Sequence, residues 1–229
     1  MKPMYGDEQP IILAHRGAPH DALENSLTAF MAAVESGFLY LETDVRLGED
    51  GVIYLQHNAS TLLPNRLLSI KDRQKPTTLA ELLEQFPGHC IAIDPKHQKV
   101  VVPLAKLIAN AGAANRICIG SSFDARAFAV AALIEQTTGV RPKVARVSAM
   151  SVLKLLGNAY VFCKFTLGDA DYIHIPHRLV TKRVIRAAHA QDLGIVAWVV
   201  NDKTRLKTLL FWGIDGVMTD EPVLAKTAP

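Results

Sequence analysis

The sequence has few of the features that mark secreted, membrane-spanning or disulfide-stabilised proteins. Its 229 residues include 3 cysteines, an odd number, and no two of them are spaced as a metal knuckle requires. The first ten residues contain no apolar signal-peptide segment. The longest apolar runs, such as 127–134, fall far short of the ~20 residues that span a bilayer. These absences predict a soluble, cytoplasmic protein without stable membrane insertion.

Strong charge of one sign is also missing. The formal net charge is +3, and the densest basic stretch, 66–75, is interrupted by Asp72. A nucleic-acid-binding protein more often has a basic stripe interleaved with aromatic residues, so we expect no nucleic-acid partner. The 49% of hydrophobic residues excludes a disordered chain and is typical of a globular protein with a sizeable core.

Short apolar runs rich in β-forming residues alternate with helical patterns from one end of the chain to the other. The eight runs are Ile11–Ala14, Leu39–Val45, Cys90–Ile93, Ile117–Ile119, Lys143–Val147, Tyr172–Ile175, Ile195–Val200 and Gly216–Met218. Apolar residues at helical spacing lie between most of them, as at Leu27, Phe30, Met31 and Val34, and at Val180, Val184, Ile185 and Ala188. This alternation predicts a parallel sheet covered by helices.

Eight such units can close on themselves, so we predict an α/β fold, a (β/α)8 TIM barrel formed by one domain over residues 1–229. The alternative is a doubly wound open sheet, but no glycine-rich dinucleotide fingerprint follows the first strand. One segment interrupts the alternation: Val52–Gln56 follows an Asp50-Gly51 turn and predicts a small hairpin insertion after the second strand. An irregular loop, Ser60–Thr78, and a helix, Leu79–Phe86, are expected next.

Carboxylates stand near the ends of two predicted strands. Glu42 and Asp44 are two residues apart, so they point to the same side of their strand about 6–7 Å apart. Asp94 directly follows the third run. Buried carboxylates that face each other need a cation or a proton, and a site made of oxygen ligands suits Mg²⁺, Ca²⁺ or Mn²⁺. A structural ion pair of Asp44 with Arg46 or Arg16 is the alternative that these residues leave open.

Basic side chains and histidines accompany the carboxylates. His15 and Arg16 directly follow the first run, Lys96 follows Asp94 by two residues, and His57 directly follows the predicted hairpin segment. Active residues of a barrel lie at the carboxyl ends of its strands, so the joint placement of these residues there indicates an active site. Taken singly, the sequence favours a core histidine for His15 and a solvated strand-end lysine for Lys96.

An ordered series of motifs resembles the glycerophosphodiester phosphodiesterase family across nearly the whole chain. The series is His15-Arg16-Gly17, Glu24-Asn25-Ser26 with Ala29-Phe30, Gly37, Glu42-x-Asp44, Asp50-Gly51, His57, Ser122-Phe123, Trp198-x-x-Asn201, and Gly213-x-Asp215-Gly216-x-x-Thr219-Asp220-x-Pro222. A lone HRG triplet would be unspecific, whereas the ordered series is specific.

The resemblance implies a phosphoric diester hydrolase with one divalent cation. It implies Glu42, Asp44 and Asp94 as cation ligands, His15 and His57 as the acid–base pair, Arg16 and Lys96 as phosphate ligands, and Trp198 as a wall of the substrate pocket. We expect His15 to be the base and His57 the acid. The implied substrates are glycerophosphodiesters such as glycerophosphocholine and glycerophosphoethanolamine, which give glycerol 3-phosphate and an alcohol, a reaction of lipid and glycerol metabolism.

Three departures from the family pattern motivate alternatives. Asn58 stands where the family usually has Asp, Asp94 stands where it usually has Glu, and the segment between His57 and Asp94 is short. One alternative is a lysophospholipid-cleaving enzyme with the same site and peripheral lipid contact, because 62–64 and 67–68 are rich in leucine. The other is a binding or regulatory barrel without turnover. The sequence does not give the oligomeric state.

Overall fold

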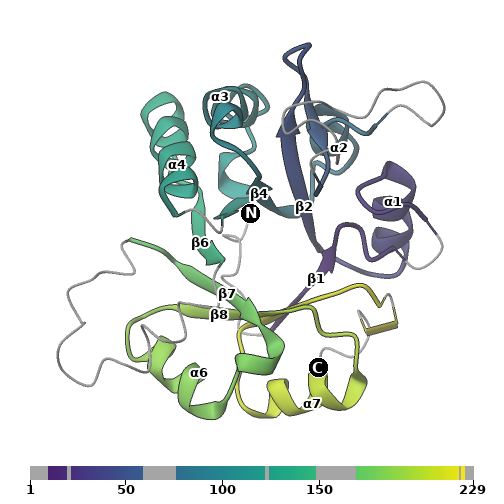
Figure 1. Cartoon of the computed structure of the whole chain (residues 1–229), viewed down its shortest axis with the longest axis vertical. Helices are drawn as coiled ribbons and strands as arrows, with labels where there is room; N and C mark the ends of the chain where they lie inside the picture. The colour runs from purple at the N-terminus through teal and green to yellow at the C-terminus, as the bar shows by residue number, and fades with distance from the viewer. Residues whose placement is uncertain are drawn as a thin grey trace.

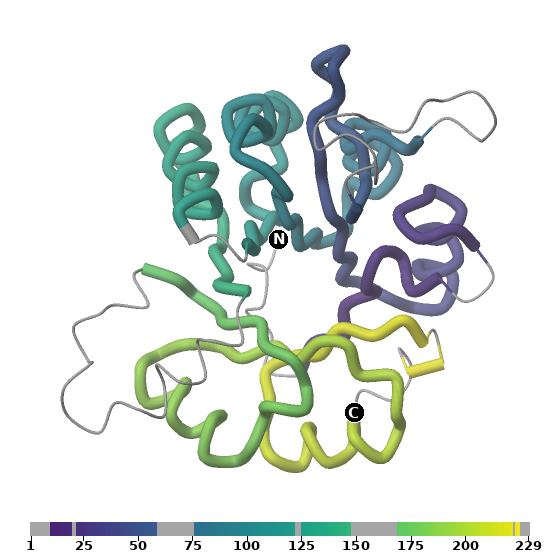
Figure 2. The backbone as a smooth tube through the Cα atoms, in the orientation of Figure 1, coloured from purple at the N-terminus to yellow at the C-terminus, as the bar shows by residue number. Residues whose placement is uncertain are grey.

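Eight parallel strands form a closed barrel in the computed structural model. The structure describes residues 10–19, 22–58, 76–121, 124–147, 169–221 and 223–224. The strands are β1 (Ile11–His15), β2 (Tyr40–Leu47), β4 (Cys90–Pro95), β5 (Ile117–Ser121), β6 (Lys143–Val147), β7 (Tyr172–Pro176), β8 (Gly194–Trp198) and β9 (Gly216–Thr219). The barrel closes where β1 pairs with both β2 and β9, and in Figure 2 the purple segment that contains β1 lies beside the yellow segment that contains β9. The predicted (β/α)8 barrel is confirmed.

Helices surround the strands, as Figure 1 shows. They are α1 (Leu27–Glu35), α2 (Leu79–Gln85), α3 (Val101–Asn110), α4 (Asp124–Thr138), α6 (Lys182–His189) and α7 (Lys203–Phe211), with short 3-10 turns η1 (Gln98–Val100), η2 (Ala114–Arg116) and η3 (His177–Leu179). Nothing in the described ranges forms a helix long and apolar enough to cross a bilayer.

Four helices begin at a polar residue whose side chain caps the first turn, whereas the N-cap of α3, Val100, makes no side-chain capping bond. Ser26, Thr78, Thr181 and Asp202 accept hydrogen bonds from backbone N–H groups of the first turns of α1, α2, α6 and α7. The predicted apolar face of α1 is wrong in one position, since Met31 is 45% exposed.

The predicted hairpin is confirmed. β3 (Ile53–Leu55) pairs antiparallel with β2, and the pairing places Leu55 opposite Val45. Gly51 has a φ of +79° in the turn, where a left-handed residue is needed. The hairpin projects away from the barrel in Figure 2 and returns the chain to the carboxyl ends of the strands. Most of the expected loop Ser60–Thr78 lies outside the described residues.

Alternation along the strands separates the inside of the barrel from its helical coat. A small interior cluster contains Ile11, Leu13, Ala92, Cys118, Ala145, Val196 and Met218. The larger core fills the space between strands and helices. Cys90 and Cys118 pack with the interior cluster as small apolar groups, as expected; Cys163 lies outside the described residues. At the carboxyl ends of the strands, polar side chains take the place of the apolar side chains that fill the barrel.

Candidate active site

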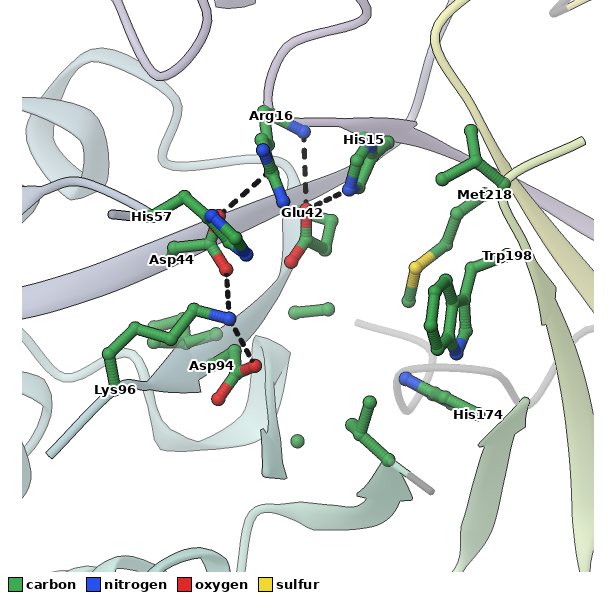
Figure 3. Close-up of a pocket in the computed structure, with 15 residues that line it drawn as sticks. His15, Arg16, Glu42, Asp44, His57, Asp94, Lys96, His174, Trp198 and Met218 are labelled. Carbon is green, nitrogen blue, oxygen red and sulfur yellow. Dashed lines mark hydrogen bonds and ion pairs between the residues drawn. The ribbon is translucent and has the colours of Figure 1, made fainter. Parts of the chain in front are cut away.

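A cavity of about 180 Å³ opens at the carboxyl ends of the strands. Its lining is His15, Arg16, Glu42, Asp44, His57, Ala92, Ile93, Asp94, Lys96, Gly120, Val147, His174, Trp198, Val199 and Met218. The parallel register explains the convergence, because His15 lies opposite Glu42 across β1 and β2, and Asp44 lies opposite Asp94 across β2 and β4. Figure 3 shows charged side chains gathered on one side and Trp198 and Met218 on the other.

The turn after β1 delivers His15 and Arg16 to the cavity. Arg16 has a φ of +51°, and Gly17 has a φ of +87°. A side chain at Gly17 would lie 2.8 Å from the Cβ atom of Ala29 in α1, so the turn needs glycine for space as well as for φ. Asn25 fastens the turn to α1: its backbone N–H donates to the Arg16 carbonyl at 3.0 Å.

Two cationic side chains neutralise two of the three carboxylates. Lys96 Nζ lies 2.6 Å from Asp44 Oδ1 and 2.7 Å from Asp94 Oδ2. Arg16 Nε lies 2.9 Å from Asp44 Oδ2, close but without hydrogen-bond alignment, and its Nη1 donates to Glu24 Oε2 at 2.9 Å. Burial lowers the pKa of Lys96, but the charges of Asp94 and Asp44 outweigh burial and raise it overall. Of the two predicted partners of Asp44, Arg16 is found.

Glu42 has less compensation. It is 7% exposed, and its carboxylate accepts a hydrogen bond from the Arg16 backbone N–H at 3.2 Å. Burial and the charge of Asp44 raise the pKa of Glu42 to about 7. The site therefore has one carboxyl group that holds a proton more tightly than usual, and a further positive charge beside it would favour the ionised form.

The carboxylate oxygens are ligands of the type that a hard divalent cation prefers, but their side chains do not converge on a single metal position. Within the described ranges, no three His, Cys, Asp or Glu side chains stand where they could hold a metal ion; Asp44 and Asp94 instead flank Lys96. Asp94 Oδ1 and Asp44 Oδ2 are nevertheless buried without an aligned hydrogen-bond partner. Together with under-compensated Glu42, these oxygens fit the ligand type that Mg²⁺, Ca²⁺ or Mn²⁺ takes.

His15 is oriented by residues from the last two strand ends. Its Nδ1 lies 2.7 Å from Asp220 Oδ1, and Asn201 Nδ2 donates to Asp220 Oδ2 at 2.9 Å. The other ring nitrogen, Nε2, lies 4.0 Å from Glu42 Oε2. Burial lowers the pKa of His15, but the hydrogen bond to Asp220 and the charge of Glu42 outweigh burial, so its pKa lies above the usual value.

His57 reaches the cavity from the end of the hairpin. Arg46 donates from Nε and Nη2 to the His57 carbonyl at 3.2 and 2.8 Å, which fixes the returning backbone. This explains why Arg46 does not pair with Asp44, the partner that the sequence also allowed. The His57 Nδ1 lies 2.9 Å from the Oδ1 atom of Asn58. The neutral amide thus occupies the orienting position beside the imidazole ring.

The opposite side of the cavity is apolar and aromatic. Trp198 from β8 and Met218 from β9 line it, and His174 from β7 forms part of the floor. Trp198 Nε1 is buried and finds no acceptor in the described part of the chain. Burial lowers the pKa of His174 to about 3, so this imidazole is neutral at physiological pH. A ligand bound here meets cations on one side and uncharged groups on the other.

Comparison with known proteins identifies the family of this chain. Residues 15–110 and 81–224 match the Glycerophosphoryl diester phosphodiesterase family. This chain belongs to that family. It is 30% identical to the Mycobacterium tuberculosis protein named probable glycerophosphodiester phosphodiesterase 2, over 94% of this chain and 89% of the relative. It is 26% identical to a glycerophosphodiester phosphodiesterase of Bacillus altitudinis, over 92% of this chain and 94% of that protein.

Solved structures share the fold. A Thermotoga maritima glycerophosphodiester phosphodiesterase has a TM-score of 0.74 and 22% identity, and covers 96% of this chain and 99% of its own. An Oleispira antarctica phosphodiesterase in complex with the product sn-glycerol-3-phosphate has a TM-score of 0.72 and 17% identity, with 96% of each chain covered. As a member of the family, the protein is a phosphoric diester hydrolase.

All eight site residues named from the sequence line this one cavity: His15, Arg16, Glu42, Asp44, His57, Asp94, Lys96 and Trp198. The motif residues Ser122, Phe123 and Pro222 lie outside the described residues. Sequence reasoning gave no role to Asp220, Asn201 or His174, which contact or line the site. Asp220 and Asn201 stand in the closing motifs, each just after a strand. Because active residues of a barrel lie at the carboxyl ends of its strands, this position could have marked both as site residues.

Proposed function

We propose that this protein hydrolyses glycerophosphodiesters, such as glycerophosphocholine and glycerophosphoethanolamine, to glycerol 3-phosphate and an alcohol. The observation that carries the proposal is the two-sided cavity, in which Arg16 and Lys96 lie among carboxylates and two histidines, across from the wall formed by Trp198. A phosphodiester is an anion joined to two less polar groups, and this division of charge matches it. The Oleispira antarctica complex with sn-glycerol-3-phosphate supports the same substrate class.

Arg16 and Lys96 bind the phosphate in this proposal, because they are the cationic side chains that line the cavity. His15, as base, takes a proton from the attacking hydroxyl group, and His57, as acid, returns a proton to the leaving alkoxide. Trp198 packs against the alcohol or head group, and its buried indole N–H is available as a donor to it.

Glu42, Asp44 and Asp94 hold one divalent cation in this proposal, with Mg²⁺, Ca²⁺ and Mn²⁺ all compatible. When bound, the cation supplies positive charge that stabilises the negative charge developing on the phosphoryl oxygens. The cation and Lys96 are alternative charge partners for Asp44 and Asp94, which lie 2.6 and 2.7 Å from the ammonium group.

Product analysis by phosphorus NMR tests the proposal. The protein is incubated with glycerophosphocholine, glycerophosphoethanolamine and lysophosphatidylcholine, each with Mg²⁺, Ca²⁺, Mn²⁺ or a chelator. We expect glycerol 3-phosphate from the first two substrates with a cation and no product with the chelator. Phosphocholine as the product would place the cleavage at the wrong bond, and no turnover of any diester would refute the proposal.

No second function is proposed. The leucine-rich segments 62–64 and 67–68, which motivated a lysophospholipid substrate, lie outside the described residues. A barrel without turnover is disfavoured, because both histidines and all three carboxylates meet in one cavity of a phosphoric diester hydrolase.

A further inference from the structure

The partners of His15 come from the far end of the chain and form a closed hydrogen-bonded network. Asp220 uses one carboxylate oxygen for His15 Nδ1, at 2.7 Å, and the other for Asn201 Nδ2, at 2.9 Å. Asn201 is fixed in turn, since its Oδ1 accepts from the Asp220 backbone N–H at 2.9 Å and from the Thr219 hydroxyl at 3.1 Å. Both carboxylate oxygens therefore have partners, which limits rotation of Asp220 away from His15.

The ionisation state of Asp220 determines which nitrogen of His15 carries the proton. Burial raises the pKa of Asp220, but the hydrogen bonds from His15 and Asn201 outweigh it and hold that pKa below the usual range. An ionised carboxylate only accepts hydrogen bonds, so His15 must present Nδ1–H to it. The proton of a neutral imidazole is then on Nδ1, and the lone pair is on Nε2.

The geometry points Nε2 toward the cavity. His15 lines the cavity, and its Nε2 lies on the side of Glu42, 4.0 Å from Oε2, which is beyond hydrogen-bond distance. The pairing of β1 with β9 brings these groups together, because β1 ends at His15 and Asp220 directly follows β9. Strand closure, rather than a local turn, therefore sets the ring orientation.

We propose that Asp220, anchored by Asn201, is a positioning residue that holds His15 in the tautomer with Nε2 unprotonated and facing the substrate. Nε2 takes the proton of the attacking hydroxyl as the new O–P bond forms, while the O–P bond to the alcohol breaks and His57 protonates the departing alkoxide. Nδ1 keeps its own proton, and the Asp220 carboxylate balances the charge of the resulting imidazolium. This inference rests on the proposed function, in which His15 is the base.

Asp220→Asn tests the inference, because an amide can donate to Nδ1 and so permits the tautomer protonated on Nε2. We expect kcat to fall on the order of 10²–10⁴-fold with little change in KM, the range found for general bases and for the loss of their orienting carboxylates. The ¹⁵N NMR spectrum of the histidines reads the tautomer directly, with His15 assigned by the signal lost in His15→Gln. Wild type should show protonated Nδ1, and the variant should show proton density moved to Nε2.

Asp215→Asn is the matched control. Asp215, which directly precedes β9, also pairs with a histidine, His189 at the end of α6, through Nε2 at 2.8 Å, but it lines a separate hollow at the opposite end of the barrel. We expect Asp215→Asn to leave kcat and the His15 signal unchanged. Asn201→Ala covers the case in which Asp220→Asn fails to fold: it keeps the carboxylate but frees it, and should give a smaller loss in kcat and a mixed tautomer.

A His15 signal unchanged in both Asp220→Asn and Asn201→Ala would overturn the inference. A loss confined to KM, or equal losses of kcat in Asp220→Asn and Asp215→Asn, would also overturn it, since either result indicates a structural role. If the wild type cleaves no diester, the proposed function fails, whereas the tautomer measurement still decides whether Asp220 positions His15.

Discussion

Glu42 has less charge compensation than Asp44 and Asp94, which both lie within ion-pair distance of Lys96. Its pKa is raised to about 7, by burial and then by the charge of Asp44. A carboxyl group whose pKa is higher in the folded state stabilises that state below the unfolded pKa, and this contribution is lost as pH rises through 7. A divalent cation would restore stability above that pH by favouring the ionised form.

Glu42→Gln should therefore abolish cation-dependent hydrolysis while the fold is retained. Without a cation, we expect the variant to be at least as stable as the wild type at pH 8, because a buried charge is removed. With Mg²⁺ or Mn²⁺, the wild type should gain thermal stability and the variant should not. Thermal unfolding at pH 8, with and without the cation, measures this difference. If the cation raised the Tm of both proteins equally, Glu42 would not be a ligand of the cation.

The two histidines should differ in their response to the leaving group. His57→Ala and His15→Ala should each lower kcat by at least ~10²-fold on a natural diester. With a p-nitrophenyl ester, whose leaving oxygen needs no proton, the defect of His57→Ala should shrink, whereas that of His15→Ala should persist. Initial rates on both substrates decide the assignment, and the opposite pattern would exchange the acid and the base.

Asn58 departs from the family pattern, which usually has Asp at this position, and its contact with His57 shows what the amide retains. Its Oδ1 lies 2.9 Å from the His57 Nδ1, which is where the family's usual Asp would place a carboxylate oxygen. The amide keeps the orientation of the ring and gives up the charge. The substitution therefore leaves the positioning contact to His57 in place.

At the scale of elements, the turn between β1 and α1 connects the fold to the site. Gly17 has a φ of +87°, and a Cβ there would lie 2.8 Å from the Ala29 side chain and 3.0 Å from backbone atoms of α1. Helix and strand can pack this closely only because the residue between them has no side chain. The same turn contains Arg16 and directly follows His15, so its geometry sets where the backbone of Arg16 lies beside the site.

Gly17→Ala should lower both stability and activity. The left-handed φ alone costs roughly 1–2 kcal/mol for a residue with a Cβ, and the contact with α1 adds to it. Gly51→Ala is the control, since Gly51 also has a positive φ, +79°, but nothing lies within 4 Å of its Cβ position. Chemical denaturation and kcat/KM of both variants separate the cost of the positive φ from that of the contact with α1. Equal stability losses with full activity in both variants would show that a side chain at residue 17 does not disturb the site.

At the scale of the whole molecule, the sequence predicts the strands of the barrel but not the contacts that form only when the barrel closes. The eight strands were predictable because each is buried on both faces and so reads as an apolar run. The hairpin was predictable from Asp50-Gly51. The contact between His15 and Asp220 spans 205 positions, and no local pattern records it. The pairing of Lys96 with both Asp44 and Asp94 likewise depends on strand register.

His174 gives the molecule a predictable sensitivity to acid. It is 1% exposed, and burial lowers its pKa to about 3. The unfolded chain binds a proton there below about pH 6.5, whereas the folded protein stays neutral at this site until about pH 3. The free energy of unfolding therefore falls as pH is lowered through this window, by up to about 1.4 kcal/mol per pH unit from this residue.

His174→Gln should flatten that acid limb, because glutamine has no proton to bind in the unfolded state. We expect the variant to lose less stability than the wild type between pH 6.5 and pH 4, even if its stability at pH 8 is lower from changed packing. His189→Gln controls for removing a histidine from an exposed site, since the His189 side chain is 43% exposed. Parallel denaturation curves for His174→Gln and the wild type over this pH range would show that His174 does not set the acid limb.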